Sequence, residues 1–307
     1  MFKSRWYFNL KNVVYLCMDA AGMKTKIIFS EKSLNYGGWH IEGPQRVKMA
    51  YEILKEKKYE FLEPEAASEE DLMGVHDTDY IWNLKKGLVE DPDTPAYGNI
   101  FEYARLSAGG AILAAKINGF SLMRPPGHHA GRNGAALGAY TRGFCYLNNV
   151  AIAVKALGKP TVILDIDGHH GNGTQEIFQG YKKVVYVSLH RYPHYPGTGA
   201  HSEGNALNFP LPADCGEQMY LETLDEALGM IKVEKFEVAA VSVGFDAHLG
   251  DLASLGLTEN SYREIGRRIG ALEKSTFFVM EGGYIGEQNG RDIDQLLRGY
   301  EEKKRII

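Results

Sequence analysis

The stretch TVILDIDGHHGNGTQE, Thr161–Glu176, is the most informative part of this sequence about the fold. Its first half is short, apolar and β-branched, which is typical of a strand buried on both faces. Side chains alternate along an extended segment, so we expect Asp165, Asp167 and His169 to point the same way. Burying two carboxylates and an imidazole together is costly unless they bind something charged. The stretch therefore predicts a strand that ends in a divalent-metal site.

Other strand-like runs also end in polar residues. They are Gly119–Met123 before RPPGHH, Val184–Ser188 before His190, Val238–Val243 before GFD, and Thr276–Met280 before EGGY. A first strand is expected in MKTKIIFS, which begins at Met23. Because the polar ends would meet at one edge of a parallel sheet, we expect the ligand to bind beyond the carboxyl ends of these strands.

Helical spacing of apolar residues occurs between several of these runs. The expected helices cover Val47–Leu54, Phe144–Leu157, Leu221–Ile231 and Tyr262–Leu272. Strands that alternate with helices predict an α/β fold with a mainly parallel sheet and helices on both faces.

Composition narrows the class of protein. The 307 residues are 44% hydrophobic and 24% charged, which suits one large globular domain. We expect residues 23–307 to form the folded domain, and residues 1–22 to be an N-terminal extension that is either an appendage or a start-site artefact. A net charge of −5 without a long basic run argues against direct nucleic-acid binding. Three scattered cysteines indicate a reducing, cytoplasmic setting, and no apolar run approaches the roughly 18 residues of a membrane span.

The polar strand ends contain the residue types of a catalytic metal site. Asp167 and His169 can each give one ligand atom to the same ion, and Asp246, at another strand end, is the best candidate for the third. Two carboxylates and one imidazole leave a coordination position open, as catalytic zinc sites do.

Nearby residues supply acid–base groups. His128 and His129 follow a rigid Pro-Pro-Gly, and a histidine there can take a proton from water and return it to a leaving amine. A carboxylate behind the histidine, such as Asp165, would fix its tautomer. Tyr284, after two glycines, could donate a hydrogen bond to a developing oxyanion.

Six ordered motifs carry a resemblance: RPPGHHA, GFCYLNNVAIA, DIDGHHGNGTQ, SLHRYPHYPGTG, VGFDAHLGD and EGGY. Together they resemble the zinc-dependent histone deacetylase family, which includes acetylpolyamine amidohydrolases, over roughly Lys24 to Tyr284. The resemblance implies the arginase-like three-layer fold, with one sheet of about eight strands. It also implies a hydrolase that removes acetyl or similar acyl groups from acetyl-lysine or acetylpolyamine amides by metal-activated water. The implied cofactor is one Zn²⁺ ion, for which Fe²⁺ or Co²⁺ can substitute.

The resemblance also implies a role for each matched residue. The zinc ligands would be Asp167, His169 and Asp246. His128 and His129 would be the tandem histidines, with His129 as the proton shuttle, and Tyr284 would polarise the carbonyl. The slot for the acyl-bearing side chain would be lined by Gly143, Phe144 and Tyr195, with Asp93 at its rim for peptide backbone. A structural K⁺ site would use Asp165, Asp167, His169, Ser188 and Leu189, partly through main-chain oxygens.

Departures from the family pattern concern the surroundings of the site. Asn172 stands behind His129 where one lysine-deacetylase branch has aspartate, so we expect His129 to be less basic. The loop between His129 and Gly143 is several residues longer than usual. Ile41 replaces a proline in HIEGPQR, and Tyr195 replaces a frequent phenylalanine.

Two other functions agree with parts of the sequence. An arginase-like binuclear manganese hydrolase would share the fold, but Asp251 in DAHLGD is one residue too far along and no GGDH motif appears. A catalytically silent acyl-binding or scaffold protein would be expected to have lost a ligand, the shuttle histidine or the tyrosine, and none is missing. The choice between acetyl-lysine and acetylpolyamine stays open, because Asp251 is the only acid in the segment after Asp246 where a polyamine-selecting residue is expected. The oligomeric state also stays open.

The remaining histidines are expected to be structural or at the surface, and they are His40, His76, His194, His201 and His248. His170, beside a candidate ligand, is expected to support the loop and not to bind the ion.

Overall fold

The computed structural model describes residues 24–231 and 235–304, so the expected extension, residues 1–22, lies outside the described residues. The centre of the molecule is an eight-stranded sheet in which all pairs are parallel, in the order β2-β1-β3-β10-β9-β6-β7-β8. Its strands are β1 (Ile27–Ile28), β2 (Phe61–Leu62), β3 (Phe120–Ser121), β6 (Thr161–Asp165), β7 (Val184–Arg191), β8 (Ala206–Leu211), β9 (Val238–Val243) and β10 (Ser275–Met280). A separate antiparallel pair is formed by β4 (Ala130–Gly131) and β5 (Gly134–Ala135).

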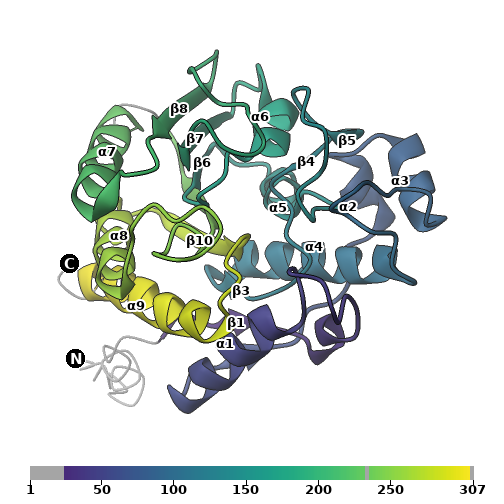
Figure 1. Ribbon diagram of the computed structural model, residues 1–307, viewed down its shortest axis with the longest axis horizontal. Coiled ribbons are helices and arrows are strands. Elements are labelled where there is room, and N and C mark those ends of the chain that lie inside the picture. Colours follow the sequence, from purple (N-terminus) through teal and green to yellow (C-terminus); the bar gives the residue numbers. More distant parts are fainter. Residues whose placement is uncertain (1–23, 232–234, 305–307) are drawn as a thin grey trace, which may run out of the picture.

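Helices cover both faces of this sheet, which gives three layers (Figure 1). One face is covered by α1 (Gln45–Glu56), α7 (Gly216–Ile231), α8 (Glu259–Gly270) and α9 (Gly286–Lys304). The other face is covered by α2 (Glu69–Met73), α3 (Thr78–Lys85), α4 (Ile100–Ile117), α5 (Asn149–Leu157) and α6 (Asn172–Phe178). A short 3₁₀ helix, η3, spans Glu31–Leu34. The α/β fold with an eight-stranded parallel sheet is therefore confirmed.

Each central strand packs against both helical layers because its side chains alternate. In β10, Phe278 and Met280 pack into the core under α1 and α7–α9, whereas Phe277 and Val279 pack into the core under α2–α6. This two-sided burial explains why the strands read as continuous apolar runs in the sequence.

One predicted helix begins later than expected. The segment Phe144–Leu157 is helical only from Asn149, and residues 144–148 form a loop. Phe144 has a φ of 70°, and the Asn148 side chain accepts a hydrogen bond from the Ala151 amide as the N-cap. The prediction was wrong for these five residues because a capping asparagine, and not the apolar pattern, sets the start of the helix.

The sheet brings the carboxyl ends of β6, β7, β9 and β10 to one edge (Figure 1). Asp165 pairs in register with Ser188 of β7 and with Ser242 of β9, while Val243 pairs with Met280. The segments after β6, β9 and β10 therefore start side by side, although up to 115 residues separate them in the sequence. Among the described residues, no helix has both the length and the apolarity that a membrane crossing requires.

Candidate functional site

Three strand-end side chains form a compact group of potential metal donors. The ligand atoms of Asp167, His169 and Asp246 all lie within 4.8 Å of one another, and all three residues are buried. His169 Nδ1 lies 2.7 Å from Asp246 Oδ2 and 3.2 Å from Asp167 Oδ1. Main-chain amides hold the carboxylates: Gly282 donates to Asp167 Oδ2 at 2.7 Å and Gly168 donates to Asp246 Oδ1 at 2.9 Å. The structure thus brings together the three residues that the sequence predicts as ligands.

This group fits a divalent cation. Burial and the nearby charge of Asp167 raise the pKa of Asp246 to about 6, and a cation between the two carboxylates would reverse this effect. Main chain approaches them closely at two glycines: a Cβ on Gly244 would lie 2.1 Å from Asp167 Oδ2, and one on Gly282 would lie 2.5 Å from Asp246 Oδ2. Two carboxylates and one imidazole match the protein ligands of a catalytic zinc site with one position free. Within residues 24–231 and 235–304 this is the one such group.

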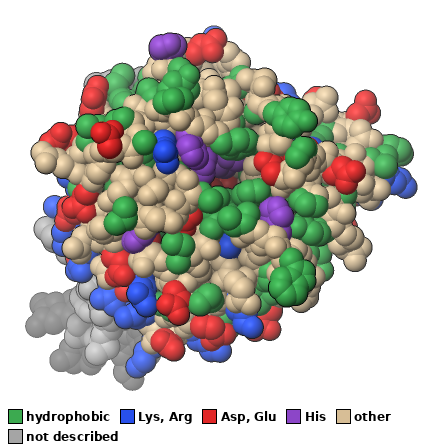
Figure 2. Space-filling view, in the orientation of Figure 1, with side chains coloured by type: hydrophobic (Ala, Val, Ile, Leu, Met, Phe, Trp, Pro, Cys, Tyr) green, Lys and Arg blue, Asp and Glu red, His purple; other side chains and the backbone are tan. Residues whose placement is uncertain are grey.

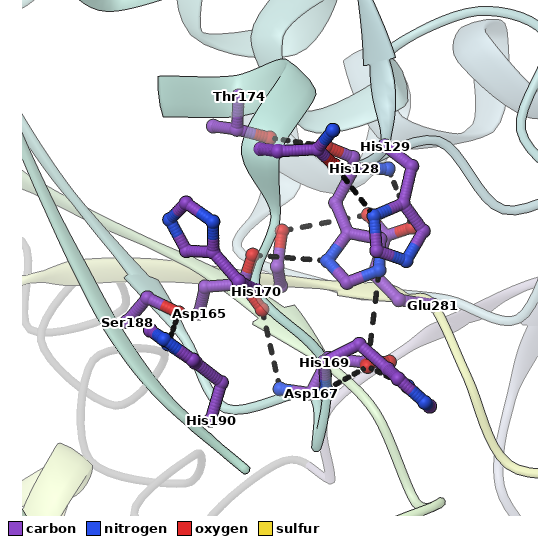
Figure 3. Close-up of polar contacts among 12 residues, drawn as sticks. His128, His129, Asp165, Asp167, His169, His170, Thr174, Ser188, His190 and Glu281 are labelled. Atoms are coloured by element: carbon purple, nitrogen blue, oxygen red, sulfur yellow. Dashed lines mark hydrogen bonds and ion pairs between the residues drawn. The ribbon is translucent and has the colours of Figure 1, made fainter. Parts of the chain in front are cut away.

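The tandem histidines beside this group contact different partners (Figure 3). His128 Nδ1 lies 3.0 Å from Asp165 Oδ2, and His128 Nε2 lies 3.8 Å from Asp167 Oδ1. Although burial disfavours the imidazolium, these two carboxylates outweigh it and raise the pKa of His128 to about 10. His128 is therefore held in its charged form.

His129 has a neutral partner, Asn172, whose oxygen lies 2.7 Å from His129 Nδ1. The Asn172 amide nitrogen donates to the Ala136 carbonyl at 2.8 Å, which directs its oxygen at the imidazole. His129 Nδ1 must then carry the proton, so its Nε2 is left with a free lone pair. Burial lowers the pKa of His129 well below its ordinary value, and positive charge on His128 and His169 acts in the same direction. The ring is thus neutral and able to accept a proton.

Glu281 is a functional residue that the sequence analysis missed. Its carboxylate accepts hydrogen bonds from the amides of Gly127, at 2.6 Å, and His128, at 3.0 Å, and burial raises its pKa to about 7. It therefore fixes the main chain that presents both histidines. The signal was its place in EGGY, one residue after a buried strand.

A pocket of about 300 Å³ opens above this cluster. It is lined by Asp93, His129, Gly143, Phe144, His169, His194, Tyr195, Leu252 and Tyr284. The predicted slot and rim residues are all among them. His194 and Leu252 were not predicted to line the pocket, and the His194 ring centroid lies 5.1 Å from that of His169. Its position directly before Tyr195 was the available signal.

The pocket is narrow where Gly143 passes between two rings. Gly143 has a φ of 50°, and a Cβ there would lie 2.5 Å from His129 Cδ2 and 3.0 Å from the Tyr195 hydroxyl. Any side chain at this position would fill the slot and strain the backbone. Phe144 meets Tyr284 edge-on, with 5.8 Å between ring centroids.

Tyr284 is held on both sides. The Arg46 guanidinium lies 4.5 Å from the centre of its ring, and Arg46 Nε donates to the Gly283 carbonyl at 2.6 Å. Asp251 accepts a hydrogen bond from the Tyr284 amide at 2.8 Å, so this carboxylate supports the loop and does not join the donor group. Burial raises the pKa of Tyr284 well above its ordinary value, which keeps the hydroxyl protonated as a hydrogen-bond donor.

Most other histidines have the supporting contacts expected of them. His76 Nδ1 lies 2.9 Å from the Gly131 carbonyl, and His76 Nε2 accepts from the Asn148 amide at 2.9 Å. His170 lies 2.7 Å from Thr198 Oγ1 and 2.9 Å from Gln175 Oε1, which fastens the loop after the donor group. The expected K⁺ site stays a prediction: Ser188 of β7 pairs with Asp165, but its hydroxyl contacts His190 Nδ1 at 2.9 Å (Figure 3).

Comparison with known proteins finds a matching domain family, related sequences and a similar solved structure. Residues 40–300 match the histone deacetylase domain family. A probable deacetylase of Archaeoglobus fulgidus is 38% identical over 302 residues, which cover 86% of this chain and 82% of the relative. Acetylpolyamine amidohydrolase 1 of Pseudomonas aeruginosa is 37% identical over 198 residues, or 59% of this chain and 55% of that protein. The crystal structure of acetylpolyamine aminohydrolase from Burkholderia pseudomallei superposes with a TM-score of 0.83 at 27% identity, covering 90% of this chain and 98% of that one.

Proposed function

The chain belongs to the histone deacetylase family, and from this premise we propose that it is a zinc-dependent deacetylase that acts on acetylated lysine side chains. The family relationship makes the chain a hydrolase of linear amide bonds. The choice of Zn²⁺ rests on one observation: the donor atoms of Asp167, His169 and Asp246 lie within 4.8 Å of one another below a pocket that His129 and Tyr284 also line.

Asp167, His169 and Asp246 would hold the ion, and His169 would do so through Nδ1, the nitrogen that faces both carboxylates. A divalent ion there would polarise the amide carbonyl and make a water molecule more acidic. His129 Nε2 would accept the proton of the attacking water and later deliver it to the leaving amine nitrogen. The Tyr284 hydroxyl would donate a hydrogen bond to the carbonyl oxygen as negative charge develops on it. Water and the amide are thereby converted into acetate and a free amine.

The different partners of the tandem histidines support this division of roles. Asn172 leaves His129 neutral, as a proton acceptor must be, whereas Asp165 keeps His128 charged. A positive His128 beside the reacting centre would stabilise negative charge and make a second proton on His129 unfavourable.

The mouth of the pocket favours acetyl-lysine over acetylpolyamines. A polyamine carries ammonium groups that need free carboxylates. Asp93, which lines the pocket, accepts two threonine hydroxyls, and Asp251, the chain neighbour of Leu252, accepts three main-chain amides. Leu252 lines the pocket and is 41% exposed.

Exposed apolar side chains continue around this opening. Trp39 and Ile41 flank His40, whose ring packs edge-on against Phe144 at 5.0 Å, and Ile285 follows Tyr284. Figure 2 shows hydrophobic side chains beside the hollow in which histidines are visible. An apolar rim suits a peptide that flanks the acetylated lysine better than it suits a polycation.

The test is acetate release by the purified, zinc-loaded protein from an acetyl-lysine peptide with apolar flanks and from N-acetylspermidine. We expect kcat/KM for the peptide to be at least tenfold higher than for N-acetylspermidine. Removal of the metal by a chelator should abolish both activities, and addition of Zn²⁺ should restore them. Leu252→Asp should raise kcat/KM for N-acetylspermidine, whereas the matched Leu252→Asn, which adds no charge, should not. A folded, zinc-containing protein that releases no acetate from either substrate would contradict the proposal.

A further inference from the structure

A single carboxylate connects the two sides of the pocket. Asp93 Oδ1 accepts a hydrogen bond from Thr94 Oγ1 at 2.6 Å, and Thr94 Oγ1 in turn accepts from the Phe144 amide at 3.1 Å. Asp93 Oδ2 accepts from Thr141 Oγ1 at 2.5 Å. The carboxylate thus ties the chain that carries Phe144 to the loop that carries Thr141.

Thr141 extends this connection to Tyr195. The Tyr195 hydroxyl donates to the Thr141 carbonyl at 3.1 Å and lies 3.1 Å from Thr141 Oγ1. Two walls of the pocket, Phe144 and Tyr195, are therefore joined by hydrogen bonds that meet at Asp93. We call Asp93, Thr94 and Thr141 the wall clamp.

The loop that supplies Thr141 is the lengthened segment between His129 and Gly143. It is fastened at both ends, because Asn172 Nδ2 donates to the Ala136 carbonyl at 2.8 Å and the Arg142 amide donates to Asp91 Oδ2 at 3.1 Å. Thr141 is 7% exposed, so its hydroxyl is largely shielded from solvent. The clamp depends on a hydroxyl at position 141 and on a tyrosine, and not phenylalanine, at position 195.

We propose that Thr141 is a positioning residue that fixes the width of the slot, so that the site admits an unbranched alkylamine chain and rejects wider amines such as arylalkylamines. The inference rests on the proposed function, because the slot must receive the amine half of an acetylated amide. Gly143 already brings the Tyr195 ring within contact of the narrowest point. If the Thr141–Asp93 bond were lost, the Thr141 main chain and the Tyr195 ring hydrogen-bonded to it could shift outward, and the space gained would accept a ring where only methylene groups fit.

The test compares Nε-acetyl-lysine N-methylamide with N-acetylbenzylamine as substrates of the zinc-loaded protein. Thr141→Val keeps the shape and removes the hydroxyl, and we expect the ratio of kcat/KM for the linear over the aromatic substrate to fall about tenfold. The change should appear as a higher KM for the linear substrate with kcat within about threefold, since the groups near the metal ligands are unchanged. Thr141→Ser should restore the wild-type ratio, because it restores the hydroxyl.

Three further variants separate a clamp from general loss of structure. Tyr195→Phe should shift the ratio in the same direction, and the Thr141→Val/Tyr195→Phe double variant should add little, because the two changes interrupt the same path from Asp93 to Tyr195. Thr276→Val removes another buried threonine hydroxyl, which donates only to the Lys274 carbonyl, and should leave the ratio at the wild-type value.

Unchanged ratios in both Thr141→Val and Tyr195→Phe would overturn the inference while leaving the proposed function intact. Should Thr141→Val fail to fold, Tyr195→Phe alone decides the outcome. If the wild type released no acetate from any of the three substrates, the two small amides and the acetyl-lysine peptide, this result would instead contradict the proposed function.

Discussion

The imidazoles of His128 and His129 lie 4.0 Å apart between ring centroids, yet one contacts a carboxylate and the other an amide. Neighbouring residues of the same type are thereby given different protonation states. Because a general base must be neutral before it acts, the partner behind each ring, and not its distance from the metal donors alone, distinguishes the two.

Replacing each histidine should separate these roles. We expect His129→Ala to lower kcat by about 10²–10⁴-fold, the range for a lost general acid–base, and His128→Ala to lower it less. Steady-state kinetics on an acetyl-lysine peptide measures both. His201→Ala, at an exposed histidine, is the control and should behave as wild type. Equal kcat for wild type and His129→Ala would be incompatible with a proton-transfer role.

Removing one metal donor should lower metal content. Asp246→Asn keeps the shape of the side chain but removes its charge, and the remaining two donors should hold Zn²⁺ much more weakly. Elemental analysis after dialysis should give close to one zinc per chain for wild type. Asp251→Asn is the matched control, because Asp251 binds main-chain amides instead of joining the donor group. Full zinc occupancy in Asp246→Asn would show that the ligand assignment is wrong, and two ions per wild-type chain would favour a binuclear centre.

The sequence predicted the parts of this molecule that depend on local pattern. The buried strands β6 and β9 and their polar ends were recognised from apolar runs followed by Asp167 and Asp246, because two-sided burial forces a continuous apolar pattern. The two-residue strand β2 has no periodicity to detect, whereas β1 lies within the predicted first strand MKTKIIFS. The helix α4 was also not predicted. It has glycines at positions 109 and 110, and close packing of the helix against the segment at Glu65 requires such residues, which lower helix propensity.

Most contacts between distant segments outside the matched motifs could not be predicted. Glu281 supports His128 across 153 residues of sequence, and Thr141 reaches Tyr195 across 54. Neither pair has a spacing rule, because the fold, and not the local chain, brings them together. The place of His194 beside the donor group could not be predicted for the same reason: a single histidine in a loop is uninformative until the loop is seen to cover the donor group.

A buried ion-pair network beneath Tyr284 should dominate local stability. Glu42 accepts from Arg46 at 3.0 Å and from Arg124 at 2.8 and 2.7 Å, and all three side chains are almost fully buried. Glu42→Gln leaves two guanidinium charges without their carboxylate, which should cost about 3–5 kcal/mol of unfolding free energy. Urea unfolding measures the loss. The control Glu69→Gln breaks an exposed pair with Lys85 and should leave stability close to that of the wild type. Similar values for the two variants would contradict a stabilising role for the network.

Stability should fall in mild acid, partly through His76. Burial lowers the pKa of His76 from 6.5 to about 4 in the folded protein. Below pH 6.5 the unfolded chain binds a proton at this residue that the folded chain does not, so its contribution is present above pH 6.5 and is lost toward pH 4. By pH 5 the loss should be about 2 kcal/mol. Urea unfolding between pH 4.5 and 7.5 should therefore show a shallower pH dependence for His76→Gln than for wild type. Parallel curves would exclude His76 as a source of the acid sensitivity.

Tyr284→Phe should fold and retain zinc but hydrolyse its substrate slowly. Phenylalanine keeps the ring contacts with Arg46 and Phe144 and removes only the hydroxyl. If that hydroxyl donates to the amide oxygen as it becomes negative, its loss should reduce kcat by about 10²–10³-fold, the typical effect of one oxyanion donor. KM should change little, because the hydrogen bond strengthens as charge develops in the transition state. Kinetics and zinc analysis on the same preparation test both statements. A Tyr284→Phe enzyme within about threefold of wild-type kcat would mean that the residue only packs against the glycine loop, and the stabilising donor would have to be sought elsewhere in the pocket.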